Sequence, residues 1–175
     1  GKKEVELLPT KISDIITVSC EFLLDQYKSK NVELVFNSNH LEHIQVNLDP
    51  TIFRYNILNN ILTNALKFSN PHSQVIINLF REDNFLIIVI EDQGIGIPKS
   101  MQESIFDSGK KSTRSGTSGE KGTGFGMPLA QSCTLKMNGT LRFESIDQSV
   151  SPDSHGTKFF LCFQILSDNK SKNAA

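Results

Sequence analysis

Two glycine-rich segments, EDQGIGIP (residues 91–98) and GEKGTGFGM (residues 119–127), carry most of the information about fold and function in this chain. The first follows the apolar run 85–90, which is typical of a central strand buried on both faces. Between the two segments lies a loop, residues 107–122, with four Gly, four basic residues and six Ser or Thr. Its composition fits a flexible surface linker. A long loop inside a compact domain is more often functional, and we expect a lid.

The remaining sequence alternates helical and strand-like patterns. Helical spacing is found in three long segments and one short segment: residues 11–28, 49–68, 127–138 and 98–106. Strand patterns are found in residues 31–37, 44–48, 74–80, 85–91, 140–145 and 157–165. This order predicts an α+β fold, a two-layer α/β sandwich in which one mixed, mostly antiparallel sheet carries three helices on one face.

Length and composition limit the possible functions. The 175 residues fit one domain, which we expect to span residues 1–166 and to be followed by a disordered tail at 167–175. A net charge of −1 gives no general attraction to nucleic acid or to a membrane surface. Three separated cysteines argue against a disulfide framework and favour a reducing compartment. Without a spanning segment or signal pattern, we expect a cytoplasmic domain, or the cytoplasmic piece of a longer, membrane-anchored protein.

An asparagine stripe follows one side of the helix predicted at residues 49–68. At helical spacing, Asn56, Asn60, Asn64 and Lys67 fall within an arc of roughly 80°. The stripe is compatible with a solvated face, but asparagine is a mediocre helix former and such faces favour Lys, Glu, Gln and Arg. A carboxamide oxygen is a suitable ligand for Mg²⁺, and a lysine one turn away can contact phosphate. We therefore expect a metal and phosphate site along this stripe.

Asp92 follows the buried strand and precedes two glycines. There its carboxylate can accept a hydrogen bond from an exocyclic amine such as that of adenine, while Gly94 and Gly96 let a flat ring approach the backbone. An ordinary strand-to-helix turn is the alternative interpretation.

The second glycine segment lies at a predicted helix N-terminus, where Gly122, Gly124 and Gly126 leave backbone N–H groups free for an anion. No Gly-Lys-Ser/Thr of a P-loop is present, and the cluster does not open a Rossmann unit.

Taken in this order, the motifs resemble the ATP-binding catalytic domain of sensor histidine kinases. Its superfamily (the Bergerat fold) includes the gyrase B subunit, mismatch-repair ATPases and a heat-shock chaperone. NNILTNALKFS (59–69) resembles the N box, EDQGIGIP the first glycine box, SIFDS (104–108) the F box and KGTGFGM (121–127) the second glycine box. In the F box, Asp107-Ser108-Gly109 replaces an acid, a proline and a second phenylalanine, and weak anchoring of the lid is expected.

The resemblance implies roles for individual residues. Asn64 would coordinate Mg²⁺ with Asn60 beside it, and Lys67 would contact phosphate; these three are the expected catalytic residues. The other expected ATP-binding residues are Phe68, Asp92, Gly94, Gly96, Ile97, Lys111, Gly122, Thr123, Gly124, Phe125 and Gly126. Lys111 would lie about where many relatives have a lid arginine that contacts phosphate, and Lys110 or Arg114 are alternatives for this role.

The resemblance also favours phosphoryl transfer over hydrolysis. ATPase branches of the superfamily place a glutamate four residues before the metal asparagine, and here that position is Asn60, which cannot accept a proton. The expected partners are a helical dimerisation domain that supplies the acceptor histidine and a response regulator receiver domain, without nucleic acid or direct membrane contact. The chain's own four histidines are expected to be exposed or structurally satisfied. An ATP-gated module of the gyrase or chaperone type, or a degenerate nucleotide sensor, remains as an alternative.

Overall fold

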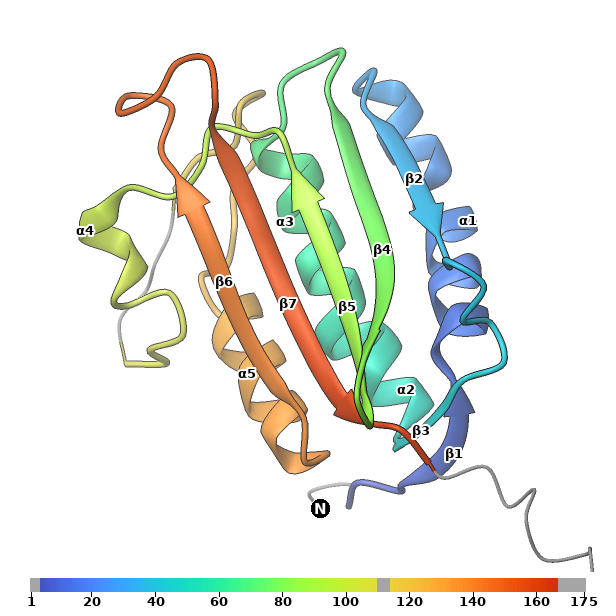
Figure 1. Cartoon of the computed structure of the whole chain (residues 1–175). Helices are drawn as coiled ribbons and strands as arrows, with labels where there is room; N and C mark the ends of the chain where they lie inside the picture. The colour runs from blue at the N-terminus through green and yellow to red at the C-terminus, as the bar shows by residue number, and fades with distance from the viewer. Residues whose placement is uncertain (1–3, 110–113, 167–175) are drawn as a thin grey trace, which may run out of the picture.

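A five-stranded sheet with helices on one face forms the domain in a computed structural model that describes residues 4–109 and 114–166 (Figure 1). The strand order is β2-β4-β5-β7-β6. The strands are β2 (Glu33–Asn37), β4 (Gln74–Glu82), β5 (Phe85–Asp92), β6 (Thr140–Ile146) and β7 (Gly156–Gln164). Among the strand pairs of this described sheet, only β2–β4 is parallel. The predicted two-layer sandwich with a mostly antiparallel sheet is therefore confirmed.

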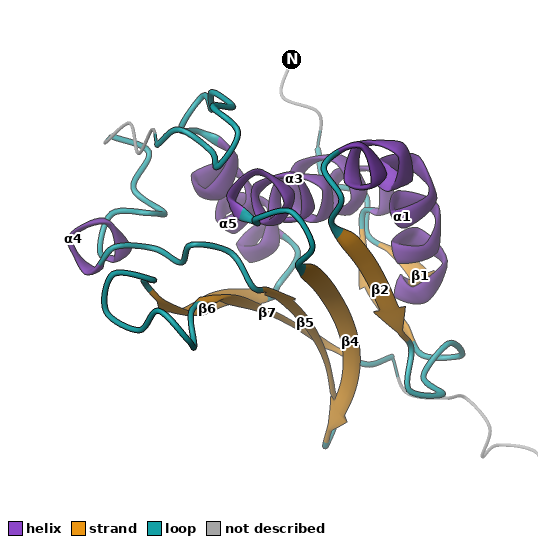
Figure 2. Ribbon diagram, turned by 90° about the horizontal axis from the view of Figure 1, so that it is seen from above, coloured by secondary structure: helices purple, strands orange, loops and turns teal. Residues whose placement is uncertain are grey.

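The helical layer contains α1 (Ile12–Ser29), the segment from α2 (Pro50–Ile52) through the π-helix η1 (Phe53–Leu58) to α3 (Asn59–Phe68), and α5 (Gly126–Lys136). Figure 2 shows these helices on the same face of the sheet. Asp49 caps the second helix, which begins where predicted: its carboxylate accepts hydrogen bonds from the backbone N–H groups of Thr51 at 3.0 Å and Ile52 at 2.9 Å.

A second, small sheet was not predicted. It pairs β1 (Leu8–Lys11) with β3 (Gln45–Leu48), so the strand expected at residues 44–48 exists but lies outside the main sheet. Pro9 and Thr10, directly before the helix predicted from residue 11, belong to β1. With only four residues and mostly exposed side chains, β1 has no alternation that a sequence pattern could reveal.

The alternation of side chains along β5 determines which face of the sheet Asp92 lies on. Leu86, Ile88 and Ile90 face the helices and are buried, and Asp92 continues this row. β5 is the central strand, as predicted, but burial on both faces holds only in part: the opposite face has no helical cover and Phe85 is 46% exposed, although Val89 is buried. The Asp92 carboxylate thus lies between the two layers.

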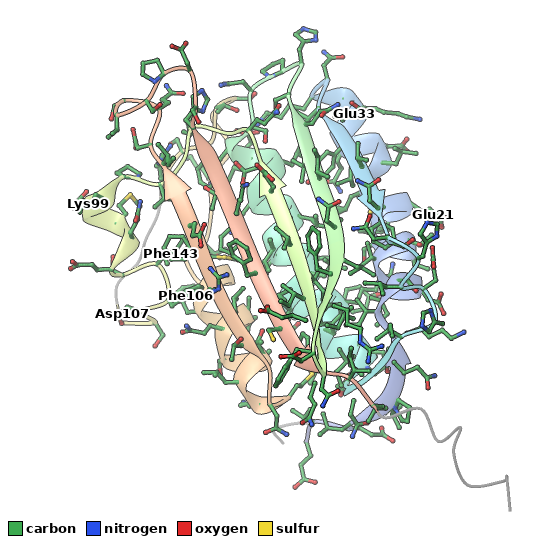
Figure 3. The ribbon with its side chains drawn as sticks, in the orientation of Figure 1. Glu21, Glu33, Lys99, Phe106, Asp107 and Phe143 are labelled. Carbon is green, nitrogen blue, oxygen red and sulfur yellow. The ribbon has the colours of Figure 1, made fainter. Side chains whose placement is uncertain are left out.

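The segment after β5 contains a shorter helix than predicted. α4 (Lys99–Gln102) ends four residues before Phe106, and turns complete the segment. Phe106 packs edge-on against Phe143 of β6 with ring centroids 5.6 Å apart (Figure 3). One aromatic contact therefore fixes the start of the predicted lid to the edge strand.

Candidate functional site

One cavity of about 390 Å³ opens between α3, the end of β5 and the glycine segments, within the size range of small-molecule sites, roughly 300–1,000 Å³. We call it the Asp92 cavity. Its lining includes most of the residues expected from the sequence: Asn60, Asn64, Lys67, Phe68, Asp92, Gly96, Ile97, Gly122, Thr123, Gly124 and Gly126. Residues from segments far apart in the sequence thus meet in one place. That they bind nucleotide stays a prediction.

Asp92 is the buried acid of this cavity, with 6% of its surface exposed. Its Oδ1 accepts hydrogen bonds from the backbone N–H of Gly94 at 2.9 Å and of Thr157 at 3.3 Å. Within residues 4–109 and 114–166 no hydrogen bond reaches Oδ2, which remains available to a donor in the cavity. Burial raises the pKa of Asp92 to about 7, although the two backbone donors act in the opposite direction.

The turn after Asp92 is fixed from three sides. The backbone N–H of Ile95 donates to Phe68 O at 3.0 Å, and that of Ile97 donates to Ser145 Oγ at 2.8 Å. Gly96 has a φ of 67°, and a Cβ there would collide with the carbonyl of Ile146, so this position requires glycine. The turn at the Asp92 end of the cavity is therefore held in one conformation by its neighbours.

Gly94 lies in this turn but does not line the cavity. A Cβ at Gly94 would crowd Phe68 O and Asp92 Oδ1, so this glycine permits the Asp92 turn instead of touching a ligand. His155 holds the same turn, with its Nδ1 at 2.5 Å from Gly94 O. This histidine is structurally satisfied, as expected.

The asparagine stripe is divided by the π-helix. Asn60 and Asn64 line the cavity, whereas Asn56 lies in η1 with its Nδ2 at 3.8 Å from Cys133 Sγ. The sequence had suggested a continuous α-helix, and the wider π turn changes the direction of residues before it relative to those after it. Asn60 Nδ2 donates to Asn56 O at 2.7 Å. The Asn60 carboxamide oxygen therefore points toward Gly126.

The other end of the cavity is basic and rich in glycine. The Lys67 ammonium lies against Gly122, where a Cβ would be 2.7 Å from Nζ. Burial lowers the pKa of Lys67, Glu120 partly opposes this effect, and Arg114 adds to it. α5 begins at Gly126 beside these groups, so backbone N–H groups and a helix dipole also favour an anion here.

Besides Gly94, two expected residues are not among the residues that line the cavity. Phe125 is 48% exposed and does not belong to the lining. Lys111 lies outside the described residues, as does Lys110. Arg114 does line the cavity, where it donates to Gly96 O at 2.9 Å and its guanidinium lies 5.2 Å from the centre of the Phe68 ring.

Sequence reasoning missed several lining residues, among them Thr63, Met101, Ile105, Glu120, Thr157 and Phe159. Thr157 pairs with Asp92 across β5 and β7, a register that only the assembled sheet reveals. Glu120 lies at the basic end of the cavity, and no local sequence pattern identifies it as a lining residue.

Mg²⁺ fits this donor set only together with phosphate. The described residues contain no group of three His, Cys, Asp or Glu side chains that could hold a metal. The Asn64 side chain makes no hydrogen bond within the described part of the chain, so its carboxamide oxygen remains free to act as a ligand. Mg²⁺ often takes one or two protein ligands and completes its shell with phosphate and water.

Comparison with known proteins supplies independent information. A family model described as histidine kinase-, DNA gyrase B- and HSP90-like ATPase matches residues 50–166. The circadian input-output histidine kinase CikA of Synechococcus elongatus is 29% identical over 146 residues, which cover 83% of this chain and 19% of that protein. This chain spans about a fifth of the length of such curated relatives.

Solved structures have the same architecture. The mycobacterial sensor histidine kinase MprB is 25% identical with a TM-score of 0.71, and the match covers 93% of this chain and 99% of that one. The catalytic domain of the histidine kinase ThkA is 18% identical with a TM-score of 0.75, over 91% of this chain and 95% of that one, and it supports the fold alone. Within the described residues, no helix has the length and apolar character needed to cross a membrane.

Proposed function

Because this chain belongs to the family of histidine kinase-, DNA gyrase B- and HSP90-like ATPases, we propose that the Asp92 cavity binds MgATP for transfer of the γ-phosphoryl group to a histidine on a separate helical domain. The observation that carries the proposal is the buried Asp92 carboxylate with one oxygen unused. Adenine presents an amine donor at the position where guanine presents a carbonyl acceptor. A carboxylate therefore favours adenine and repels guanine.

The opposite end of the cavity suits the triphosphate. Lys67 supplies a charge, Gly122 and Gly124 allow close approach of the backbone, and α5 directs its N-terminus to the same region. Asn64 would hold Mg²⁺ when it arrives with ATP, and the ion would neutralise phosphate charge. The protein's own contribution is to position the phosphates and to stabilise their charge, which is most of what phosphoryl transfer requires.

Transfer is favoured over hydrolysis because, among the described residues, no suitable general base lines the end of the cavity proposed for the phosphates. In the described part of the chain, the lining contains two carboxylates. Asp92 lies at the end proposed for adenine, and Glu120 is paired with Lys30. Asn60 stands where a base would be expected and cannot accept a proton. Water therefore lacks an activating group.

The partners belong to the same proposal: a helical dimerisation domain that carries the acceptor histidine, and a response regulator receiver domain that takes the phosphoryl group from it. The cytoplasm is the proposed compartment. The cysteines at positions 20, 133 and 162 are all free thiols, as is usual in a reducing environment.

Calorimetry with MgATP and MgGTP tests the nucleotide site. The parent chain should bind MgATP much more tightly than MgGTP, and Asp92→Asn should weaken MgATP binding by about 10- to 100-fold, the effect of one hydrogen bond to a charged group. Glu144→Gln is the matched control, since Glu144 pairs with Arg142 at 2.8 Å in an exposed ion pair and is not a lining residue of the cavity. Equal binding of ATP and GTP would refute the assignment.

A transfer assay separates the kinase from an ATPase. The chain is mixed with [γ-³²P]ATP and a histidine-bearing dimerisation domain, and labelled histidine and free phosphate are counted. The proposal predicts labelled histidine and little steady hydrolysis by the chain alone. Steady hydrolysis that is lost in Asn60→Ala would instead support a gyrase- or chaperone-like ATPase.

A further inference from the structure

Lys30 joins three separate elements through one ammonium group. It follows the C-terminus of α1, and its Nζ donates to Leu66 O and Lys67 O at 2.9 Å each and to Glu120 Oε1 at 2.6 Å. Only 10% of the Lys30 side chain is exposed. A charge this buried is costly unless it is fully paired, so all three contacts are needed to keep it there.

Glu120, the partner of Lys30, lines the Asp92 cavity at the end where phosphate is expected. Its charge acts on Lys67, whose pKa it raises against the effect of burial. Gly116 fits between these two side chains, since a Cβ there would collide with Glu120 Oε2 and Lys67 Cγ. An unpaired carboxylate at this position would attract Lys67 and repel an incoming polyphosphate.

A hydrogen-bonded turn holds Glu120 in place. The backbone N–H of Gly116 donates to Glu120 O at 2.9 Å, and that of Thr117 donates to Lys67 O at 3.0 Å. Thr117 Oγ1 also donates to Ser69 O at 2.7 Å. The turn, residues 116–120, is thus docked on the C-terminal end of α3. Within it, the backbone N–H of Ser118 donates to Glu120 Oε2 at 2.9 Å, which orients the carboxylate at the cavity rim.

We propose that Lys30 is a positioning residue of the nucleotide site: it neutralises Glu120 at the cavity rim and thereby leaves Lys67 free for the phosphates of ATP. The inference rests on the proposed function. It assigns a role in phosphate binding to the residue that follows α1, which does not itself line the Asp92 cavity.

A purely structural role for Lys30 makes different predictions. If Lys30 only caps α3 through Leu66 O and Lys67 O, its loss would disturb the whole site. Binding of adenosine, which has no phosphate, would then fall as much as binding of MgATP, and removal of the Glu120 charge would restore nothing. A charge effect acts on the phosphates alone and disappears with the Glu120 carboxylate.

The test is a double-mutant cycle on the full chain, with MgATP and adenosine as ligands. Lys30→Met should weaken MgATP binding about tenfold, equivalent to ~1.4 kcal/mol, and change adenosine binding less than twofold. Glu120→Gln should strengthen MgATP binding two- to fivefold, and the double variant should bind MgATP within about twofold of Glu120→Gln. Lys30→Arg keeps the charge and should retain most of the MgATP affinity.

Arg142→Met provides the control, because Arg142 forms an exposed ion pair with Glu144 away from the cavity and should affect neither ligand. The inference would be overturned if the effects of Lys30→Met and Glu120→Gln on MgATP affinity were additive, or if Lys30→Met lowered the affinities for MgATP and adenosine equally. If Lys30→Met does not fold, Glu120→Gln alone decides, since weaker MgATP binding by that variant contradicts the charge role. A parent chain that binds no MgATP would refute the proposed function itself, which is a separate outcome.

Discussion

Nucleotide binding should depend on pH through Asp92. The pKa of this carboxyl is raised to about 7 mainly by burial, so near neutral pH the empty site is a mixture of protonated and ionised forms. An adenine amine donates a hydrogen bond, which favours the ionised form, and the pKa of Asp92 must fall when the base binds. Binding below pH 7 therefore releases a proton.

The size of the effect follows from the titration. With a pKa near 7, the ionised fraction of Asp92 falls about tenfold between pH 8 and pH 6. The affinity for adenosine should therefore fall about tenfold, or ~1.4 kcal/mol. Adenosine is the appropriate ligand, because the terminal phosphate of ATP titrates in the same range. Other titratable groups that act near Asp92 are Glu91, His155 and Tyr27.

Calorimetry in two buffers of different ionisation enthalpy measures both affinity and proton release. At pH 7 about half a proton should be released per adenosine bound. Asp92→Asn should remove this release and flatten the pH dependence, and His155→Asn separates any contribution of the neighbouring ring. An adenosine affinity that is constant from pH 6 to pH 8 in the parent chain would refute the reasoning.

Three further predictions concern stability and metal dependence. Because the folded-state pKa of Asp92 lies above its unfolded value, its contribution to stability is present below about pH 4 and is lost as pH rises through about 7. Urea denaturation at pH 8 should therefore show Asp92→Asn to be more stable than the parent, by at most ~4 kcal/mol, with the advantage shrinking toward pH 4. Asn64→Ala should abolish most of the Mg²⁺-dependent part of ATP affinity without lowering the melting temperature, and an unchanged dissociation constant in Mg²⁺ would exclude the metal role. Gly96→Ala should cost about 1–3 kcal/mol in urea denaturation, because its backbone is left-handed and its Cβ would meet Ile146 O; a stability equal to the parent's would contradict the described turn.

The main fold was predictable because its signals are local and periodic. The helix predicted from residue 49 opens with Asp49-Pro50, whose capping chemistry is local, and the apolar run at residues 85–90 placed Asp92 at a strand end. The small β1–β3 sheet was missed because β1 is short and mostly exposed. The wide turn of η1 was missed because nothing in FRYNIL distinguishes a π-helix from an α-helix.

The candidate site was predictable where it consists of motifs, and not where it depends on distant contacts. Asn60, Asn64, Lys67 and Asp92 occur in recognisable segments, and the fold brings them together. The pairing of Lys30 with Glu120 joins residues 90 apart in the sequence, and neither residue has a distinctive neighbour. Such a pair becomes visible only when α1, α3 and the turn at residues 116–120 are assembled.

A crystal structure of the chain with Mg²⁺ and a non-hydrolysable ATP analogue tests the central claim most directly. The account predicts the adenine amine on Asp92 Oδ2, and the phosphates between Lys67 and Gly122 with the metal on Asn64. A nucleotide bound outside the Asp92 cavity, or one with its phosphates at the Asp92 end, would contradict it.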